Sequence, residues 1–233
     1  MATRRRAWMS WSSGKDSAFA LQAARAHADL EIVALLTTVT DAFERVSMHG
    51  VREELLRAQA RAVGLPLIDV RIPSPCPNTV YEERMAAALG AAAADGVDTI
   101  VFGDLYLTDI RAYREQRLSA IGFRAEFPLW LRDTRALARE MVGSGLRAVI
   151  TCVDPRKVPG ALAGREFDAR LLEDLPAGVD PCGENGEFHT FVHAGGPLRE
   201  AIPVRVGETV ERDGFVFADV LPAGAGGHAE ARA

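Results

Sequence analysis

Short apolar runs alternate with amphipathic stretches along the first two-thirds of the chain. Apolar runs of about four to eight residues are typical of buried strands, and the stretches between them repeat their apolar positions with the period of a helix. This alternation predicts an α/β fold with a doubly wound parallel sheet that helices cover on both faces. The predicted strands are 7–11, 31–38, 66–72, 99–102 and 147–153, and the predicted helices are 17–27, 51–63, 79–95 with Asn78 as its cap, 110–121 and 134–142.

The last third of the chain has a different pattern, with Pro- and Gly-rich segments followed by three strand-like runs at 188–192, 202–210 and 215–220. Asp213-Gly214 between the last two runs predicts a tight hairpin. We therefore expect two domains and a tail. The first domain spans 1–128, a smaller C-terminal α+β domain spans 129–222, and 223–233 form a disordered tail because they have little to bury.

Composition narrows the class of protein. The 233 residues carry a net charge of −5, which argues against a general binder of nucleic acid or of anionic membranes. Cys76, Cys152 and Cys182 lack the spacing of a disulfide framework or a zinc site, which favours a cytoplasmic protein. No apolar run approaches the roughly 18 residues of a membrane span.

The loop Ser12–Ser17, Ser-Ser-Gly-Lys-Asp-Ser, lies between the first predicted strand and helix and has the layout of an anion site. Gly14 permits close approach of the backbone, and Lys15 adds a positive charge. The chain has 25 arginines and two lysines, so a lysine here suggests that a forked guanidinium would not fit. A Walker A loop is excluded because Met9 and Asp16 occupy positions that need Gly and Ser/Thr.

Asp16 is the unusual residue of this loop, because a carboxylate repels a phosphate unless a cation lies between them. Mg²⁺ bridges such groups, so Asp16 predicts a magnesium-bound polyphosphate. The alternative is that Asp16 only favours the dipole of the helix that follows.

A second acidic motif, Gly-Glu-Asn-Gly-Glu-Phe-His-Thr, occupies 183–190. It places Glu184 and Glu187 three residues apart in a Gly-rich loop that enters a predicted strand. Two such carboxylates can hold a cation or take a proton from an attacking amine. The alternative for an isolated segment is a solvated acidic turn.

The loop Ser12–Ser17 resembles the pyrophosphate loop of the ATP pyrophosphatases, which have the adenine nucleotide alpha-hydrolase-like fold. Within that group the chain resembles the diphthine–ammonia ligase family. This resemblance rests on the second motif, on Gly103-Asp104 and on the segments 109–115, 127–130 and 140–150. All of them occur in the same order as in the family, and the resemblance extends over residues 8–192, approximately. The second motif departs from the family pattern at two positions, since Asn185 and His189 replace Gly and Glu, and Cys182 precedes it.

The resemblance implies that ATP is cleaved between its α and β phosphates, that a carboxylate is adenylated, and that ammonia displaces AMP to leave an amide. It also implies the site residues. ATP and Mg²⁺ would bind Ser12, Ser13, Gly14, Lys15, Asp16, Ser17, Gly103 and Asp104, and Asp16 would reach Mg²⁺ through the phosphates. The catalytic residues would be Lys15, Asp16, Glu184 and Glu187, with the two glutamates on the acceptor or ammonia side. Weaker candidates for substrate binding are Arg111, Glu115 and His49.

Two of these assignments have open alternatives. A helix with Arg111, Arg114 and Glu115 can equally be an ion-paired solvated face. His49, in the loop after the second strand, either reaches the adenosine or is simply solvated.

The sequence therefore predicts a cytoplasmic ligase that joins ammonia to a carboxylate-bearing substrate, in a chain that can form a homodimer. The Arg-, Ala- and Gly-rich composition suggests a bacterial source, for which an acceptor other than diphthine is expected. The alternative function is a non-catalytic ATP sensor of the same fold, which does not need Asp16. A tRNA-thiolating enzyme would need paired cysteines and a basic surface, which the sequence does not offer.

Overall fold

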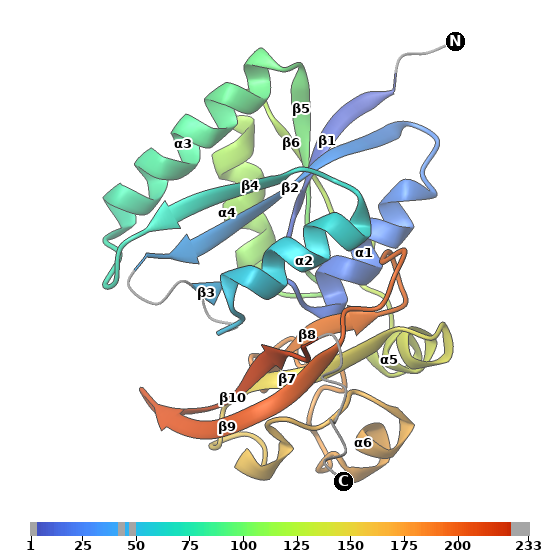
Figure 1. The fold of residues 1–233 in the computed structure, drawn as a ribbon. Coiled ribbons are helices and arrows are strands. Elements are labelled where there is room, and N and C mark those ends of the chain that lie inside the picture. Colours follow the sequence, from blue (N-terminus) through green and yellow to red (C-terminus); the bar gives the residue numbers. More distant parts are fainter. Residues whose placement is uncertain (1–3, 42–44, 47–49, 225–233) are drawn as a thin grey trace, which may run out of the picture.

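The computed structural model describes residues 4–41, 45–46 and 50–224, which form two sheets (Figure 1). In the first, sheet A, the strand order is β3-β2-β1-β5-β6, with β4 also paired to β2. Every pairing in sheet A is parallel except that of β3, which confirms the predicted α/β class. Its strands are β1 (Arg5–Ser10), β2 (Leu30–Thr40), β3 (Arg45–Val46), β4 (Leu67–Ile72), β5 (Val97–Val101) and β6 (Arg124–Glu126).

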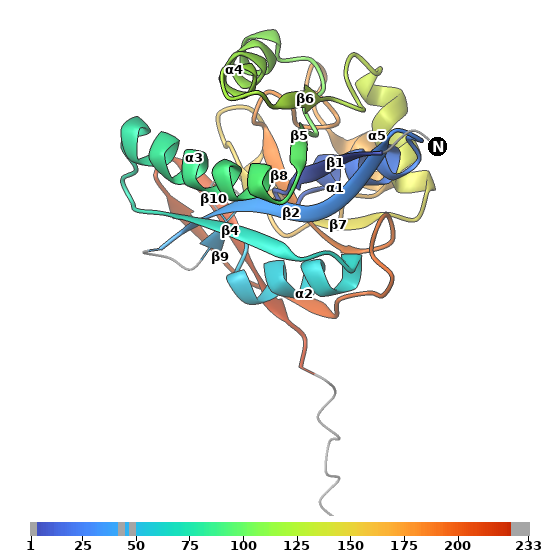
Figure 2. The same cartoon turned by 90° about the horizontal axis from the view of Figure 1, so that it is seen from above.

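Two pairs of helices cover the two faces of sheet A (Figure 2). On one face Leu21 and Leu55 pack in the same core as Leu35, and on the other Leu89 and Leu118 pack with Ile100. The helices of the first face are α1 (Lys15–Arg25) and α2 (Glu53–Val63), and those of the second are α3 (Asn78–Ala94) and α4 (Thr108–Ser119).

The start of α3 differs from the prediction. Asn78 is already the first helical residue, the cap position is Pro77, and no side chain caps the helix. The prediction of Asn78 as the cap was wrong because the fixed φ of a proline suits the turn into a helix, so the helix begins one residue earlier than a capping side chain would place it.

The second sheet, sheet B, is antiparallel and has the strand order β8-β7-β10-β9. The predicted strand at 147–153 belongs here as β7 and does not extend the parallel sheet. Asp213 and Gly214 have φ of 52° and 78° between β9 and β10, as the hairpin prediction requires. The elements of this part are α5 (Thr134–Gly143), β7 (Arg147–Val153), the 3₁₀ turn Gly160–Leu162, α6 (Ala169–Asp174), β8 (Phe188–Ala194), β9 (Val204–Arg212) and β10 (Phe215–Pro222).

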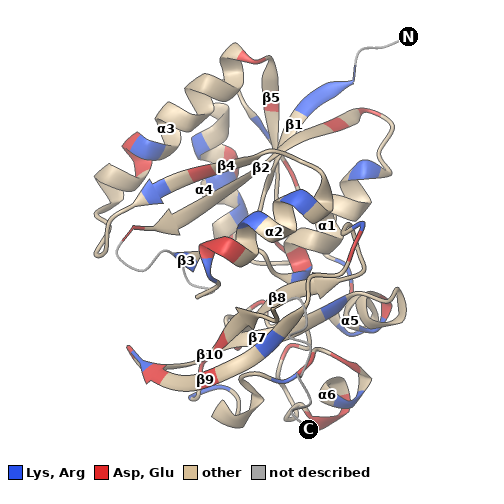
Figure 3. Cartoon of the chain, in the orientation of Figure 1, with Lys and Arg blue, Asp and Glu red and all other residues tan. Residues whose placement is uncertain are grey.

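The two sheets are joined by polar contacts as well as by a shared core. Asp219 on β10 accepts hydrogen bonds from Arg45, on β3 of sheet A, at 3.0 Å and from Arg52, just before α2, at 2.6 Å. The backbone N–H of Val192 on β8 donates to the carbonyl of Ser13 at 3.0 Å. Basic and acidic residues are interspersed along the elements (Figure 3), so ion pairs between neighbours are common. No helix within the described ranges is both long enough and apolar enough to span a membrane.

Candidate functional site

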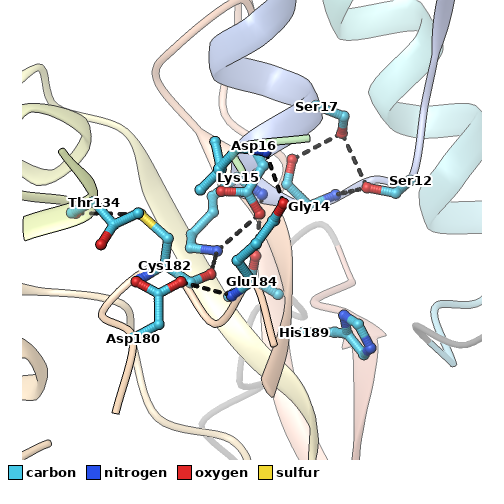
Figure 4. Close-up of polar contacts among 12 residues, drawn as sticks. Ser12, Gly14, Lys15, Asp16, Ser17, Thr134, Asp180, Cys182, Glu184 and His189 are labelled. Atoms are coloured by element: carbon cyan, nitrogen blue, oxygen red, sulfur yellow. Dashed lines mark hydrogen bonds and ion pairs between the residues drawn. The ribbon is translucent and has the colours of Figure 1, made fainter. Parts of the chain in front are cut away.

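The loop between β1 and α1 is braced by its own serines (Figure 4). Gly14 is the cap of α1 and has an extended backbone. The hydroxyl of Ser12 lies 3.2 Å from that of Ser17 and accepts a 3.4 Å hydrogen bond from the N–H of Gly14, while Ser17 donates to the Gly14 carbonyl at 3.0 Å. The first N–H groups of a helix have no partner inside the helix, so this braced turn can present them to an anion.

Ser13 has a left-handed backbone conformation, with φ of 70°, and its carbonyl group is held by hydrogen bonds from residues outside the loop. That carbonyl accepts hydrogen bonds from Gln59 Nε2 at 2.9 Å and from the N–H of Val192 at 3.0 Å. The C=O and N–H of a trans peptide point in opposite directions, so the anchored carbonyl turns the Gly14 N–H toward the opposite side.

Gln59 is fully buried on α2 and links three segments of the chain. Besides binding Ser13, it accepts a hydrogen bond from Trp11 Nε1 at 2.9 Å and donates to the Val192 carbonyl at 2.7 Å. The sequence analysis missed this residue. The signal was available, because a glutamine between Leu56 and Val63 occupies a core-facing position of an amphipathic helix.

The side chain of Lys15 is directed into the second part of the molecule. Its ammonium group donates to the Cys182 carbonyl and to Asp16, the latter at 2.9 Å, and lies 5.4 and 5.3 Å from the ring centres of Phe167 and Phe188. Burial is the largest single influence and would lower the pKa of Lys15, but Asp16, Cys182 and Asp180 together outweigh it, so the pKa is raised. Lys15 therefore stays charged, and in this structure it ties α1 to the loop that precedes β8.

The two predicted motifs are in direct contact although they are far apart in the sequence. Thr190, the last residue of the second motif, accepts a 3.0 Å hydrogen bond from the backbone N–H of Lys15. Glu184 accepts from the N–H groups of Leu105 at 2.7 Å and Tyr106 at 3.4 Å, directly after Gly103-Asp104. The structure thus brings Glu184 to the same edge of sheet A as the first loop (Figure 4).

Burial raises the pKa of Asp16, and it also shifts the pKa of Glu184 strongly. Burial, followed by the negative charges of Asp16 and Asp104, raises its pKa to about 7. Its two backbone hydrogen bonds oppose this rise only in part. Glu184 therefore changes protonation state near neutral pH, as an acid or base of catalysis must.

Glu187 lies deeper and contacts its own loop. It is 4% exposed, and one carboxylate oxygen accepts from the N–H of Asp180 at 3.3 Å and from the Asn185 amide at 3.0 Å. Asp180 in turn accepts from Tyr106 at 3.3 Å and from the N–H of Glu184 at 2.9 Å. Asp180 and Tyr106, which the sequence analysis did not select, therefore help to hold Glu184 in place.

Three residues at or just before the second motif depart from the family pattern, and each has a different environment in the structure. Cys182 is buried, its thiol donates to the Thr134 carbonyl at 3.4 Å, and burial raises its pKa, so it lacks the features of a nucleophile. Asn185 supports Glu187. Burial, with the charge of Lys15, lowers the pKa of His189 to about 4, so its imidazole is neutral.

Gly103 and Asp104 flank the first loop from β5. A Cβ on Gly103 would lie 2.9 Å from the Asp16 carbonyl carbon and the Ser17 nitrogen, so only glycine permits this approach. Asp104 pairs with Arg114 at 3.2 Å, and the Arg114 guanidinium lies 4.3 Å from the ring centre of Phe102.

Arg111 and Glu115 form an ion pair with each other at 2.7 Å, and Arg111 also stacks on Phe127 and Trp130 at 4.8 and 4.6 Å. This is the arrangement of an ion-paired helix face, and a role for these two residues in substrate binding stays a prediction. His49 lies outside the described residues.

A cavity of about 360 Å³ adjoins the first loop at the carboxyl ends of β1, β2 and β5. Ligands of open α/β sheets bind at this edge, and the volume is in the usual range for small-molecule sites. We call it the nucleotide cavity. Its polar lining includes Ser10, Ser12, Thr37, Thr38, Arg114 and His189.

One carboxylate of the site is available to bind Mg²⁺. In the part of the chain that is described, no three His, Cys, Asp or Glu side chains are grouped as metal ligands. Mg²⁺ in nucleotide sites commonly uses one or two carboxylates, with phosphates and water as its other ligands. One Asp16 oxygen pairs with Lys15, and the other is buried without a hydrogen-bond partner among the described residues. Asp16 therefore fits the role of the single protein carboxylate.

Ser13→Gly is expected to raise the free energy of unfolding by about 1 kcal/mol. A left-handed residue with a side chain costs about 1–2 kcal/mol, and the buried Ser13 hydroxyl has no hydrogen-bond partner among the described residues. Greater freedom of the unfolded chain offsets about 0.4–1 kcal/mol of the gain. Urea unfolding checks this, with Ser13→Ala as the control that removes only the hydroxyl. A lower stability of the glycine variant would show that the hydroxyl is needed.

Comparisons with known proteins find matches over both parts of the chain. A family model described as the diphthamide synthase N-terminal domain matches residues 5–125, and one described as the C-terminal domain matches residues 133–217. The diphthine–ammonia ligase of Danio rerio is 29% identical over 231 residues, which cover 90% of both chains. The enzyme of that name from Homo sapiens is 26% identical over 233 residues, covering 90% of this chain and 86% of its own. That of Rattus norvegicus is 37% identical over 98 residues, covering 40% and 36%.

Proposed function

This chain belongs to the diphthamide synthase family, and from that premise we propose that it is an ATP-dependent ligase that adenylates a carboxylate and amidates it with ammonia. The observation that supports this most is the direct contact between the two motifs. Thr190 binds the backbone of Lys15, and Glu184 faces Asp16 beside the nucleotide cavity. A site for a nucleotide and a group that changes protonation near pH 7 therefore lie together.

In the proposed first step, a carboxylate oxygen of the acceptor forms a bond to the α-phosphorus of ATP, and the bond from that phosphorus to the bridging oxygen breaks. Pyrophosphate leaves with the bonding electrons. The N–H groups of the first turn of α1 after Lys15, whose own N–H binds Thr190, would stabilise its charge, since Ser12, Ser17 and Gln59 brace the loop at the start of this helix. Mg²⁺, held by Asp16, would supply further charge neutralisation on the phosphates.

In the proposed second step, ammonia forms a bond to the carbonyl carbon of the acyl adenylate, and AMP leaves. Ammonia is largely protonated at neutral pH, and the attacking nitrogen must also lose a proton to become an amide. Glu184 is the proposed acceptor of this proton, because its pKa of about 7 lets it both take and release one. Lys15, buried between the motifs, would hold the two loops at a constant separation.

Several finer assignments belong to this proposal. Residues 1–128 would bind the nucleotide and 129–222 would contribute the acceptor side, in a cytoplasmic protein that can form a homodimer. The acceptor is a carboxylate. The relatives are named for diphthine.

Product analysis tests the proposal. Purified protein is incubated with Mg²⁺-ATP, ammonium and an extract of the source cell, and AMP, ADP and pyrophosphate are resolved. AMP and pyrophosphate are expected only with extract and are expected to fall at least 100-fold in Asp16→Asn, while Asp29→Asn, at an exposed position beyond α1, is expected to be unaffected. ADP as the product, or tight ATP binding without turnover, would instead favour the ATP sensor.

Glu184→Gln is expected to change two pH dependences. Because the folded-state pKa of Glu184 is raised from 4.5 to about 7, the folded protein holds this proton more tightly than the unfolded chain does. The free energy of unfolding of the wild type should therefore fall as pH rises between about 4.5 and about 7, and the glutamine variant should lack this part of the decrease. The ligase activity of the wild type should rise as pH increases through about 7. The glutamine variant should lack this rise and should be about 100-fold slower. Unfolding in urea across this pH range checks the first result without an acceptor, and identical curves would contradict it.

A further inference from the structure

A second cavity, of about 260 Å³, adjoins the nucleotide cavity between sheets A and B. Val46 on β3 and His189 on β8 line both cavities. The two cavities are therefore parts of one cleft, and His189 stands at their junction. Ser12 of the first loop lines the nucleotide cavity, so the second cavity is connected through that cavity to the place where the phosphates of a nucleotide would lie.

The second cavity combines an apolar wall with positive charge. Phe215 and Phe217 of the β9–β10 hairpin form the wall, with ring centres 6.4 Å apart. The guanidinium of Arg212 lies 5.0 Å from the ring centre of Phe217, and Arg45 lines the cavity from the side of sheet A. A guanidinium over an aromatic ring keeps in-plane N–H donors directed outward, which suits a carboxylate.

Among the described residues, the lining of the second cavity carries two basic side chains, Arg45 and Arg212, and one acidic side chain, Asp213. Asp219 accepts from both Arg45 and Arg52, so one carboxylate faces two guanidinium groups. Asp213 also lines the cavity, but its side chain is 91% exposed and 4.0 Å from Arg212. The neutral imidazole of His189 adds no charge to this lining.

We propose that this second cavity binds the acceptor, and that the acceptor is an acid with an apolar or aromatic body. Its body packs on Phe215 and Phe217, Arg45 and Arg212 attract its negative charge, and its carboxylate reaches the nucleotide past His189. The identification of the bound acid as the acceptor rests on the proposed ligase function. The binding chemistry is testable without turnover.

The probe for the test is 2-naphthoate, compared with the neutral 2-naphthamide of nearly the same shape. Binding to the full chain is measured by probe fluorescence. The acid is expected to bind at least tenfold more tightly than the amide, and Arg212→Gln should remove most of this difference. Phe217→Ser should weaken both probes at least fivefold, because it removes part of the apolar wall. ATP affinity, measured in parallel, should change less than twofold in both variants.

The groove between α3 and α4 provides the matched control. It has a volume of about 460 Å³ and is lined by Met85, Tyr113 and Ile121, among others, so it is the competing apolar site for the probe. Tyr113→Ser should leave probe binding unchanged. No binding of the acid, equal affinity of the acid and the amide, or a loss of binding in Tyr113→Ser would each overturn the assignment.

The outcomes separate the inference from the proposed function. If the acid binds as expected but no AMP is formed with any extract, the ligase function fails and the acid site stands. If AMP is formed at the wild-type rate by Arg212→Gln and Phe217→Ser, the ligase function stands and the assignment of the acceptor to this cavity fails.

Discussion

Gln59→Met is expected to lower the free energy of unfolding by about 2–6 kcal/mol and the affinity for ATP at least tenfold. Methionine has nearly the same length, so the packing of α2 is kept while all three hydrogen bonds are lost. The buried Trp11 N–H and Val192 carbonyl lose the partners that Gln59 supplies, at about 1–3 kcal/mol each. The Ser13 carbonyl keeps only its bond to Val192, so the peptide that orients the Gly14 N–H is held by one hydrogen bond instead of two.

Urea unfolding and an ATP titration measure the two effects. Gln22→Met, at an exposed position of α1, is the matched control and should change stability by less than about 0.5 kcal/mol. Gln59→Glu keeps an acceptor for Trp11 but has no amide donor for Ser13 or Val192. It should therefore bind ATP weakly at neutral pH. Wild-type ATP affinity in Gln59→Met would show that Val192 alone holds the loop.

Gly103→Ala is expected to reduce ATP affinity about 100-fold and stability by about 1–3 kcal/mol. Its Cβ would lie 2.9 Å from backbone atoms of Asp16 and Ser17, and backbone cannot move aside as the end of a flexible side chain can. Overpacking of this kind costs about 1–3 kcal/mol. The shift would displace the first turn of α1, whose N–H groups are the proposed phosphate ligands.

The control for this experiment is Gly90→Ala in α3, where no atom lies within 4 Å of the new Cβ. Alanine is favoured over glycine in a helix by roughly 0.5–1 kcal/mol, so this variant should be more stable than the wild type and bind ATP normally. Thermal unfolding with and without ATP compares the two. Equal stabilisation of both variants by ATP would show that Gly103 does not position the loop.

Sequence patterns were sufficient to predict the helices and strands whose apolar residues repeat with a clear period or form a clear run. The helix at 51–63 and the strand at 147–153 lie within two residues of α2 and β7, because each buries a regular apolar stripe or run. The Asp213-Gly214 hairpin followed from local turn chemistry. The elements β3, β6 and α6 were not predicted, since two to six residues are too few to show a period.

The tail predicted at 223–233 falls almost entirely outside the described residues, since only 223 and 224 are described. The division into two domains near 128 stays a prediction.

By itself, the sequence determined the alternation of strands and helices and the positions of both acidic motifs, and it predicted anion binding at Ser12–Ser17, because each of these is encoded by neighbours in the chain. Only the tertiary structure decided where Lys15 points, that Gln59 anchors the loop, and that burial beside Asp16 and Asp104 raises the pKa of Glu184 to about 7. These properties depend on groups far apart in the sequence, and on the loss of water when they are packed together. No local pattern records either of these.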